Sequence, residues 1–207
     1  MRSPALTHTR LGRLGALVLC VFVSEPIPAL ALTLGPEELA LLRSGAAVVT
    51  VSPDGDGADG RVEAAIDIAA PRAKVWPVLL DCARAPSFMP ALKACTVLSK
   101  GPGDAWDVRE HRISWTDFLP ETRSVFRSEY TRETLIRFTR VEGDLSFLEG
   151  DWRLEPLDGG TRTRLHYRAR IGINLPVPSF LIRGALERDV PNFLRALRAE
   201  ILRPAAR

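Results

Sequence analysis

The fold of this chain is decided by two consecutive stretches, Glu142-Gly-Asp-Leu-Ser-Phe-Leu-Glu-Gly-Asp-Trp-Arg-Leu-Glu-Pro-Leu157 and Gly159-Gly-Thr-Arg-Thr-Arg-Leu-His-Tyr-Arg-Ala-Arg-Ile171. In the second stretch, apolar side chains alternate with charged or polar ones, which is the period of a β-strand with one dry and one solvated face. The apolar positions are Leu165, Tyr167, Ala169 and Ile171, and the positions between them are Arg164, His166, Arg168 and Arg170. The dry face of such a strand needs a second element to cover it.

A long helix near the C-terminus is predicted to supply that cover. Apolar residues recur there at steps of three and four, the spacing that places side chains on one face of a helix. They are Leu186, Val190, Phe193, Leu194, Leu197 and Ile201. We expect this helix to end near Arg203 and to pack its apolar stripe on the preceding strands.

The N-terminus has the features of a secretory leader. Arg2, Arg10 and Arg13 precede an apolar run over residues 14–23, and Ala29-Leu-Ala31 offers the small residues of a cleavage site. The run of about ten apolar residues is shorter than the ~20 that span a bilayer, so an uncleaved anchor is the weaker alternative. The sequence therefore predicts a cleaved signal peptide over residues 1–31 and a periplasmic or secreted protein.

The charge balance argues against a nucleic-acid partner. Removing the leader takes away three Arg and one Glu and leaves a net charge of +1. Proteins that bind nucleic acids usually carry a clear basic excess on one face. The one basic cluster consists of Arg162, Arg164, Arg168 and Arg170. We interpret it as a solvated sheet face paired with acids such as Asp151 and Glu155.

Residues 32–60 are expected to form an N-terminal extension. It holds a short helix from Pro36 to Arg43, a strand over residues 47–51, and a Gly/Asp-rich segment over residues 54–60. That segment invites a calcium interpretation, but Ala58 and Ala65 stand where a calcium loop needs ligands. We expect a hairpin turn and no metal.

The main domain is expected over residues 61–203. Its predicted order is a strand over residues 61–69, a helix opened by Pro71, a short second helix over residues 85–92, and an antiparallel meander. The four strands that precede the two stretches quoted above are predicted over residues 95–100, 106–115, 122–131 and 135–142.

This order resembles the START-like superfamily of birch-allergen-type helix-grip proteins, and in particular its polyketide cyclase/dehydrase and coenzyme Q-binding START branch. The motifs that carry the resemblance are Ala70-Pro71 with Val75-Trp76, Asp81 with Pro86-x-Phe88-x-Pro90, Gly143-Asp144, Gly150-x-Trp152-x-Leu154, Leu175-Pro-x-Pro178 and Asp189-Val-Pro191. The resemblance implies an α+β helix-grip fold, in which a curved antiparallel sheet of about seven strands wraps around the long C-terminal helix. Two short helices follow the first main strand.

The resemblance also implies a cavity between sheet and helix for a hydrophobic molecule. The candidate ligand-binding residues are Phe88, Met89, Trp115, Phe126, Tyr130, Phe138, Trp152, Tyr167, Leu186 and Phe193. Every helix-on-sheet protein needs such residues for its core, so a filled interior stays open as an alternative.

Cys82 and Cys95 are the two cysteines that remain after leader removal. Relatives tend to carry aromatic residues after the position of Asp81 and before that of Pro86, where this chain has Cys82 and Ala85. An oxidising compartment favours pairing of the two thiols. A bridge here would stabilise the fold by ~3 kcal/mol on the chain-entropy argument, and two buried free thiols are the alternative.

Catalytic signals are weak. The candidates for proton transfer are His111, Asp117 and Tyr130, although a surface position is the ordinary outcome for His111 between Arg109 and Arg112. The sequence shows no triad order, no zinc-ligand spacing, no phosphate-binding glycine loop and no dinucleotide fingerprint. We therefore expect a non-enzymatic carrier of a lipid, isoprenoid quinone or polyketide-like molecule, without a cofactor. The alternative is a cyclase, aromatase or dehydratase, and transient membrane contact stays open.

Overall fold

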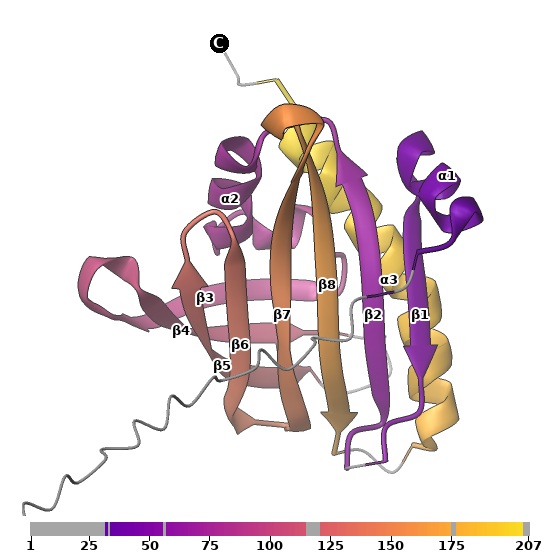
Figure 1. Ribbon diagram of the computed structural model, residues 1–207. Coiled ribbons are helices and arrows are strands. Elements are labelled where there is room, and N and C mark those ends of the chain that lie inside the picture. The colour runs from indigo at the N-terminus through magenta and orange to yellow at the C-terminus, as the bar shows by residue number, and fades with distance from the viewer. Residues whose placement is uncertain (1–31, 33, 56, 115–120, 175–176, 205–207) are drawn as a thin grey trace, which may run out of the picture. The chain divides into compact units, whose positions relative to one another are not determined.

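The computed structural model describes residues 32, 34–55, 57–114, 121–174 and 177–204 (Figure 1). The predicted signal peptide, Trp115 and Asp117 lie outside these residues. Within them, no helix is both long enough and apolar enough to cross a bilayer.

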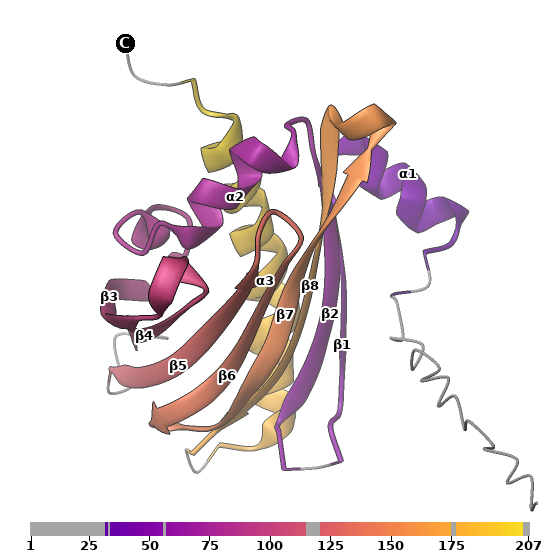
Figure 2. The same cartoon turned by 60° about the vertical axis from the view of Figure 1, so that its left-hand side comes forward.

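One antiparallel sheet of eight strands organises the domain. Its strands follow the order β1-β2-β8-β7-β6-β5-β4-β3. Their bounds are β1 Ala47–Ser52, β2 Gly60–Ile68, β3 Leu92–Lys100, β4 Trp106–Ile113, β5 Thr122–Thr131, β6 Leu135–Gly143, β7 Leu145–Leu157 and β8 Arg162–Ile173. The sheet curves strongly, and helix α3, Ser179–Leu202, runs along its concave side (Figures 1 and 2). This is the expected helix-grip arrangement.

The sheet has eight strands rather than about seven because the strand of the N-terminal segment joins it. β1 pairs antiparallel with β2 from Ala47 opposite Ile66 to Ser52 opposite Arg61. α1, Pro36–Ser44, precedes it with proline at its first position, and Gly45 ends that helix in the left-handed conformation at φ 85°. The strand thus forms one edge of the sheet.

The predicted helix over residues 85–92 is wrong in extent. After α2, Arg72–Leu80, the chain forms a single 3₁₀ turn, η1, over Ala85–Ser87. Pro90 lacks an N–H group and disfavours helical backbone at the residue before it, so the turn cannot continue. β3 accordingly begins at Leu92 instead of Cys95, and β4 ends at Ile113.

The core lies between α3 and the dry face of β8 and β2. Leu165 of β8 and Leu194 and Leu197 of α3 are fully buried, as their periodicities predicted. Val62 and Ile66 of β2 are also fully buried and extend this core toward β1.

The opposite face of β8 carries ion pairs. Arg168 binds Asp151 at 2.7 Å, which confirms the expected pairing, and His166 faces Glu155 at 2.9 Å. Arg164 binds the buried Asp67 at 2.7 Å. The arginine positions of this strand therefore pair with acids of neighbouring strands.

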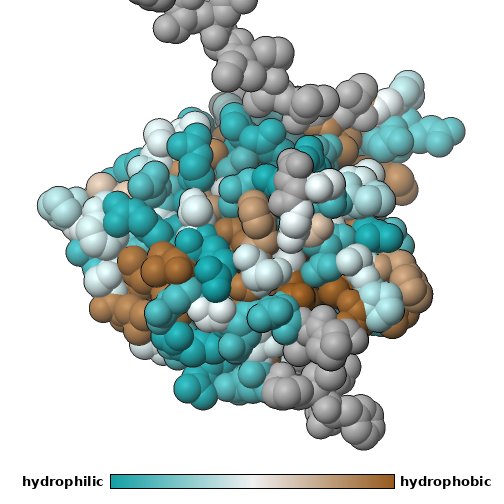
Figure 3. All heavy atoms as spheres, turned by 90° about the horizontal axis from the view of Figure 1, so that it is seen from below, coloured by the Kyte–Doolittle hydropathy of each residue, from teal (hydrophilic) through white to brown (hydrophobic). Residues whose placement is uncertain are grey.

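The end of the domain at which α3 begins exposes apolar side chains. Figure 3 views this end and shows apolar patches between hydrophilic ones. At the start of α3, Phe180 is 62% exposed and Leu181 is 53% exposed.

Candidate ligand-binding cavity

A cavity of about 200 Å³ lies between the curved sheet, the segment around η1, and α3. Its walls come from α2, the η1 segment, strands β4 to β8, and α3. The lining residues are Leu79, Ala85, Phe88, Met89, Arg109, His111, Ile113, Ser124, Phe126, Ser128, Tyr130, Ile136, Phe138, Leu145, Leu148, Trp152, Tyr167, Ile171 and Phe193. Most of this wall is apolar or aromatic, which suits a hydrophobic ligand.

The cavity gathers most of the candidate residues named from the sequence. Those that line it are Phe88, Met89, Phe126, Tyr130, Phe138, Trp152, Tyr167 and Phe193. Leu186 is not among them: it is buried where α3 packs closely on β2, with its Cδ1 3.4 Å from the position that a side chain on Gly60 would occupy. Trp115 is outside the described residues. That these residues contact a ligand stays a prediction.

One side of the cavity is a connected aromatic wall. The rings of Trp152 and Tyr167, on adjacent strands, have centroids 4.3 Å apart, and Phe193 of α3 meets Trp152 edge-on at 5.7 Å. Phe88 stacks on Phe193 at 6.4 Å and so joins the η1 segment to α3. Burial raises the pKa of Tyr167, which keeps its hydroxyl neutral. The aromatic wall therefore presents uncharged ring faces and ring edges to the cavity.

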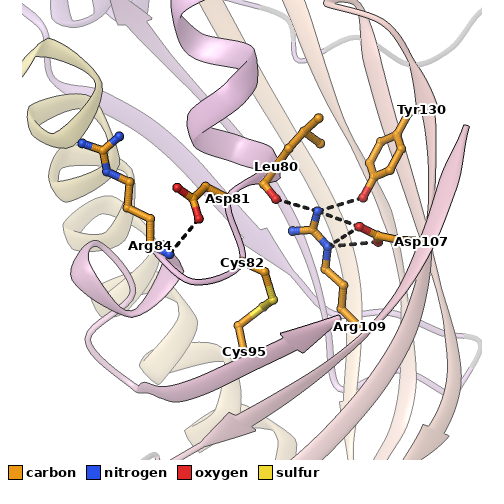
Figure 4. The surroundings of a disulfide bond; sticks show 8 residues. All are labelled: Leu80, Asp81, Cys82, Arg84, Cys95, Asp107, Arg109 and Tyr130. Carbon is orange, nitrogen blue, oxygen red and sulfur yellow. Dashed lines mark hydrogen bonds and ion pairs between the residues drawn. A yellow bond between two sulfur atoms is a disulfide. The ribbon is translucent and has the colours of Figure 1, made fainter. Parts of the chain in front are cut away.

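The other side contains a buried ion pair. Arg109 donates from Nε to both carboxylate oxygens of Asp107, at 3.0 and 2.9 Å (Figure 4). Its Nη2 donates to the hydroxyl of Tyr130 and to the carbonyl of Leu80, both at 2.9 Å. Burial disfavours the charge on Arg109, but the hydrogen bonds and charges of Asp107 and Tyr130 outweigh it and raise the pKa of the guanidinium.

This cluster has a structural task. Leu80 is the last residue of α2, where helix carbonyls lack intrahelical partners. The guanidinium of Arg109 on β4 donates a hydrogen bond to the carbonyl of Leu80 and so fixes the end of α2 against the sheet. Tyr130 also meets Trp76 of α2 edge-on at 6.2 Å. Burial raises the pKa of Tyr130, with the charge of Arg109 acting in the opposite sense.

His111 lies in the cavity wall and not on the surface. Its ring meets Phe126 edge-on at 4.7 Å. Burial, and secondly the charge of Arg109, lower its pKa from 6.5 to about 4. The imidazole is therefore neutral at pH 7.

The disulfide between Cys82 and Cys95 lies beside this cluster (Figure 4). It joins the segment after α2 to β3, with the two Cα atoms 5.3 Å apart. Phe88 and Met89, which line the cavity, lie between the two cysteines in the sequence. The bridge therefore holds one wall of the cavity.

Arg109, Ser124 and Ser128 also line the cavity, although they were not predicted as site residues from the sequence. The available signal was the period of β5, in which Ser124, Phe126, Ser128 and Tyr130 share one face. Among the described lining residues none is a carboxylate, and the described chain contains no cluster of His, Cys, Asp and Glu that could hold a metal. Asp117 lies outside the described residues.

Comparisons with known proteins agree with this architecture. A family described as "Polyketide cyclase / dehydrase and lipid transport" matches residues 68–198. Among curated proteins, none matches the chain at a significant level.

Solved structures share the fold at low sequence identity. The ZhuI aromatase/cyclase from Streptomyces sp. R1128 is 19% identical, with a TM-score of 0.59 over 68% of this chain and 92% of that one. The STAR-related lipid transfer protein from Xanthomonas axonopodis is 19% identical, with a TM-score of 0.63 over 76% and 94% of the two chains. Human STARD10 is 9% identical, with a TM-score of 0.65 over 83% and 81%.

Proposed function

Because this chain belongs to the START-like family of polyketide cyclases, dehydrases and lipid transport proteins, we propose that it carries a hydrophobic small molecule in the cavity beneath α3, without transforming it. The observation that supports this most is the composition of the wall. Aromatic and aliphatic side chains form most of it, and the guanidinium of Arg109 is already engaged by Asp107 and by the carbonyl of Leu80. Such a site holds apolar molecules and has few groups free to act on them.

The size of the cavity limits the cargo. An engineered apolar cavity of about 150 Å³ binds benzene. A cavity of about 200 Å³ therefore suits a compact bicyclic ring system or a short segment of a longer chain. A whole lipid or quinone needs the cavity to widen, and the η1 segment with Phe88 and Met89 is the part of the wall outside regular helices and strands.

A cyclase, aromatase or dehydratase is the second candidate, because the structure places His111 and Tyr130 in the cavity. Proton transfer near neutral pH works best with groups whose pKa lies close to 7. Here the pKa of His111 falls to about 4 and that of Tyr130 rises above its ordinary value. Both shifts weaken these groups as base and acid, and this favours the carrier.

The compartment is part of the proposal. The leader-like residues 1–31 and the bridge between Cys82 and Cys95 both support a periplasmic or secreted protein, since disulfides persist in oxidising compartments. Phe180 and Leu181, exposed where α3 begins, support a transient contact with a membrane from which cargo is taken.

The experiment is native mass spectrometry of the full chain produced with its leader and isolated from the periplasm, followed by organic extraction of what is bound. We expect a stoichiometric apolar molecule. Leu148→Trp fills the cavity and should abolish the bound mass, whereas the control Val141→Trp, at a position 52% exposed, should retain it. An empty wild-type protein that also binds no added apolar ligand would reject the carrier, and turnover of a polyketide-like substrate would establish the enzyme.

A further inference from the structure

We propose that Ser124 and His111 form a recognition site for an uncharged hydrogen-bonding group, a hydroxyl or a ketone, on the apolar ligand. This inference rests on the proposed function and names the chemistry of the cargo's polar end. Under this proposal, Ser124 and His111 determine which of several ligands of similar size binds most tightly.

Ser124 carries a buried hydroxyl that has no partner among the described residues. The residue is 1% exposed, it lines the cavity, and its Oγ has no hydrogen bond to any described residue. Thr163 shows the ordinary arrangement, because its equally buried hydroxyl donates to the carbonyl of Ala70 at 2.8 Å. Buried polar atoms in folded proteins are nearly always paired, so an unpaired one facing a cavity marks a place for a ligand atom.

His111 stands directly beside this hydroxyl. The two residues are opposite each other in the antiparallel pairing of β4 with β5, and both line the cavity. Side chains in such a cross-strand pair begin about 5 Å apart. A neutral imidazole presents one donor and one acceptor, and the ring of His111 lies in the cavity wall against Phe126. One ligand oxygen can therefore meet both residues.

The charges around the site select against an ionised ligand. Arg109, two residues before His111 on β4, is the cation that lines the cavity, and both oxygens of Asp107 already bind it. A ligand carboxylate would add an uncompensated negative charge to a mostly apolar cavity, and an ammonium group would meet the guanidinium of Arg109. A hydroxyl or a carbonyl adds no charge and satisfies Ser124.

The test uses three probes of one size that fit the cavity: naphthalene, 2-naphthol and 2-naphthoate at pH 7. Their affinities are measured by titration calorimetry with the full chain after removal of bound lipid. We expect 2-naphthol to bind about five- to ten-fold more tightly than naphthalene, the worth of one or two net hydrogen bonds, and 2-naphthoate to bind most weakly.

Two variants assign the preference to this site. Ser124→Ala should reduce the advantage of 2-naphthol over naphthalene to less than two-fold. His111→Phe keeps an aromatic ring in edge-on contact with Phe126 and should reduce the advantage of 2-naphthol over naphthalene in part. The control Ser99→Ala, on the exposed part of β3, should behave as the wild type.

The outcomes separate the two proposals. If naphthalene binds and 2-naphthol binds no better, or if its advantage survives in Ser124→Ala, the recognition site is refuted while the carrier stands. If 2-naphthoate binds more tightly than 2-naphthol, the proposal that the ligand has an uncharged polar end is refuted, and the carrier proposal is unaffected. If a folded protein binds neither naphthalene nor 2-naphthol, both proposals fall.

Discussion

Removal of the bridge between Cys82 and Cys95 should weaken the fold by a calculable amount. The two residues are 13 positions apart in the sequence, and the bridge restricts that loop in the unfolded chain. The chain-entropy relation gives ~3 kcal/mol at 25 °C for a loop of this length. For a protein of this size, that corresponds to a melting temperature lower by about 6–12 °C.

The assay is urea denaturation of the wild type and of Cys82→Ala/Cys95→Ala, each with and without reductant. Reductant should lower the wild-type free energy of unfolding by ~3 kcal/mol. It should not affect the double variant, which is the internal control for other effects of the reagent. A wild type that is indifferent to reductant, or one whose thiols are fully alkylated before reduction, would refute the reasoning.

The same bridge should influence the ligand. Phe88 and Met89 lie in the bridged loop and line the cavity, and Phe88 stacks on Phe193 of α3. Loosening the loop should speed the release of bound naphthalene, measured by stopped-flow fluorescence. An unchanged release rate would show that the cargo leaves by another wall.

Three further outcomes are expected. Arg109→Met should cost about 3–5 kcal/mol in urea denaturation, because it leaves the buried Asp107 and the carbonyl of Leu80 without their partner, and adding Asp107→Leu should recover a large part of that loss. The stability conferred by neutral His111 is present above pH 6.5 and should be lost as the pH falls toward about 4. Over this range the free energy of unfolding of the wild type should fall by about 1–3 kcal/mol more than that of His111→Phe. Parallel curves of stability against pH for the two proteins would contradict this. Thr163→Val should lower stability by about 1 kcal/mol while Ser124→Ala leaves it unchanged or higher, because only the threonine hydroxyl has a partner to lose; equal losses in calorimetric scans would contradict the contrast.

The periods of β8 and α3 allowed the buried faces of these two elements to be predicted, whereas the helix-grip architecture and the aromatic cavity were implied by the family resemblance. Leu165 and Leu194 lie in the core as those periods require. Leu186 has the same helical period but packs against β2, since a stripe that runs the length of α3 passes beyond the cavity. Periodicity finds the buried face of an element and does not show which part of that face meets empty space.

The polar residues of the cavity were harder to predict for a different reason. On a strand, Arg109 and His111 alternate with Glu110 and Arg112, so both faces of β4 carry charged or polar groups. The usual contrast between an apolar and a polar face is missing there. Only the pairing of β4 with β5, which places Arg109 opposite Phe126, shows which set points inward.

The polar groups of the cavity wall differ in what satisfies them. Arg109 is bound by Asp107, Tyr130 and the end of α2, so the protein itself completes this cluster. Ser124 has no such partner among the described residues, and His111 lies opposite it in the pairing of β4 with β5. In the proposed carrier, the first set fixes the geometry of the cavity whether it is loaded or empty, and the second is completed only by the cargo. Ligand binding should therefore stabilise the folded state through Ser124 and His111, and a carrier built in this way can change its preferred cargo by substitutions there without weakening its fold.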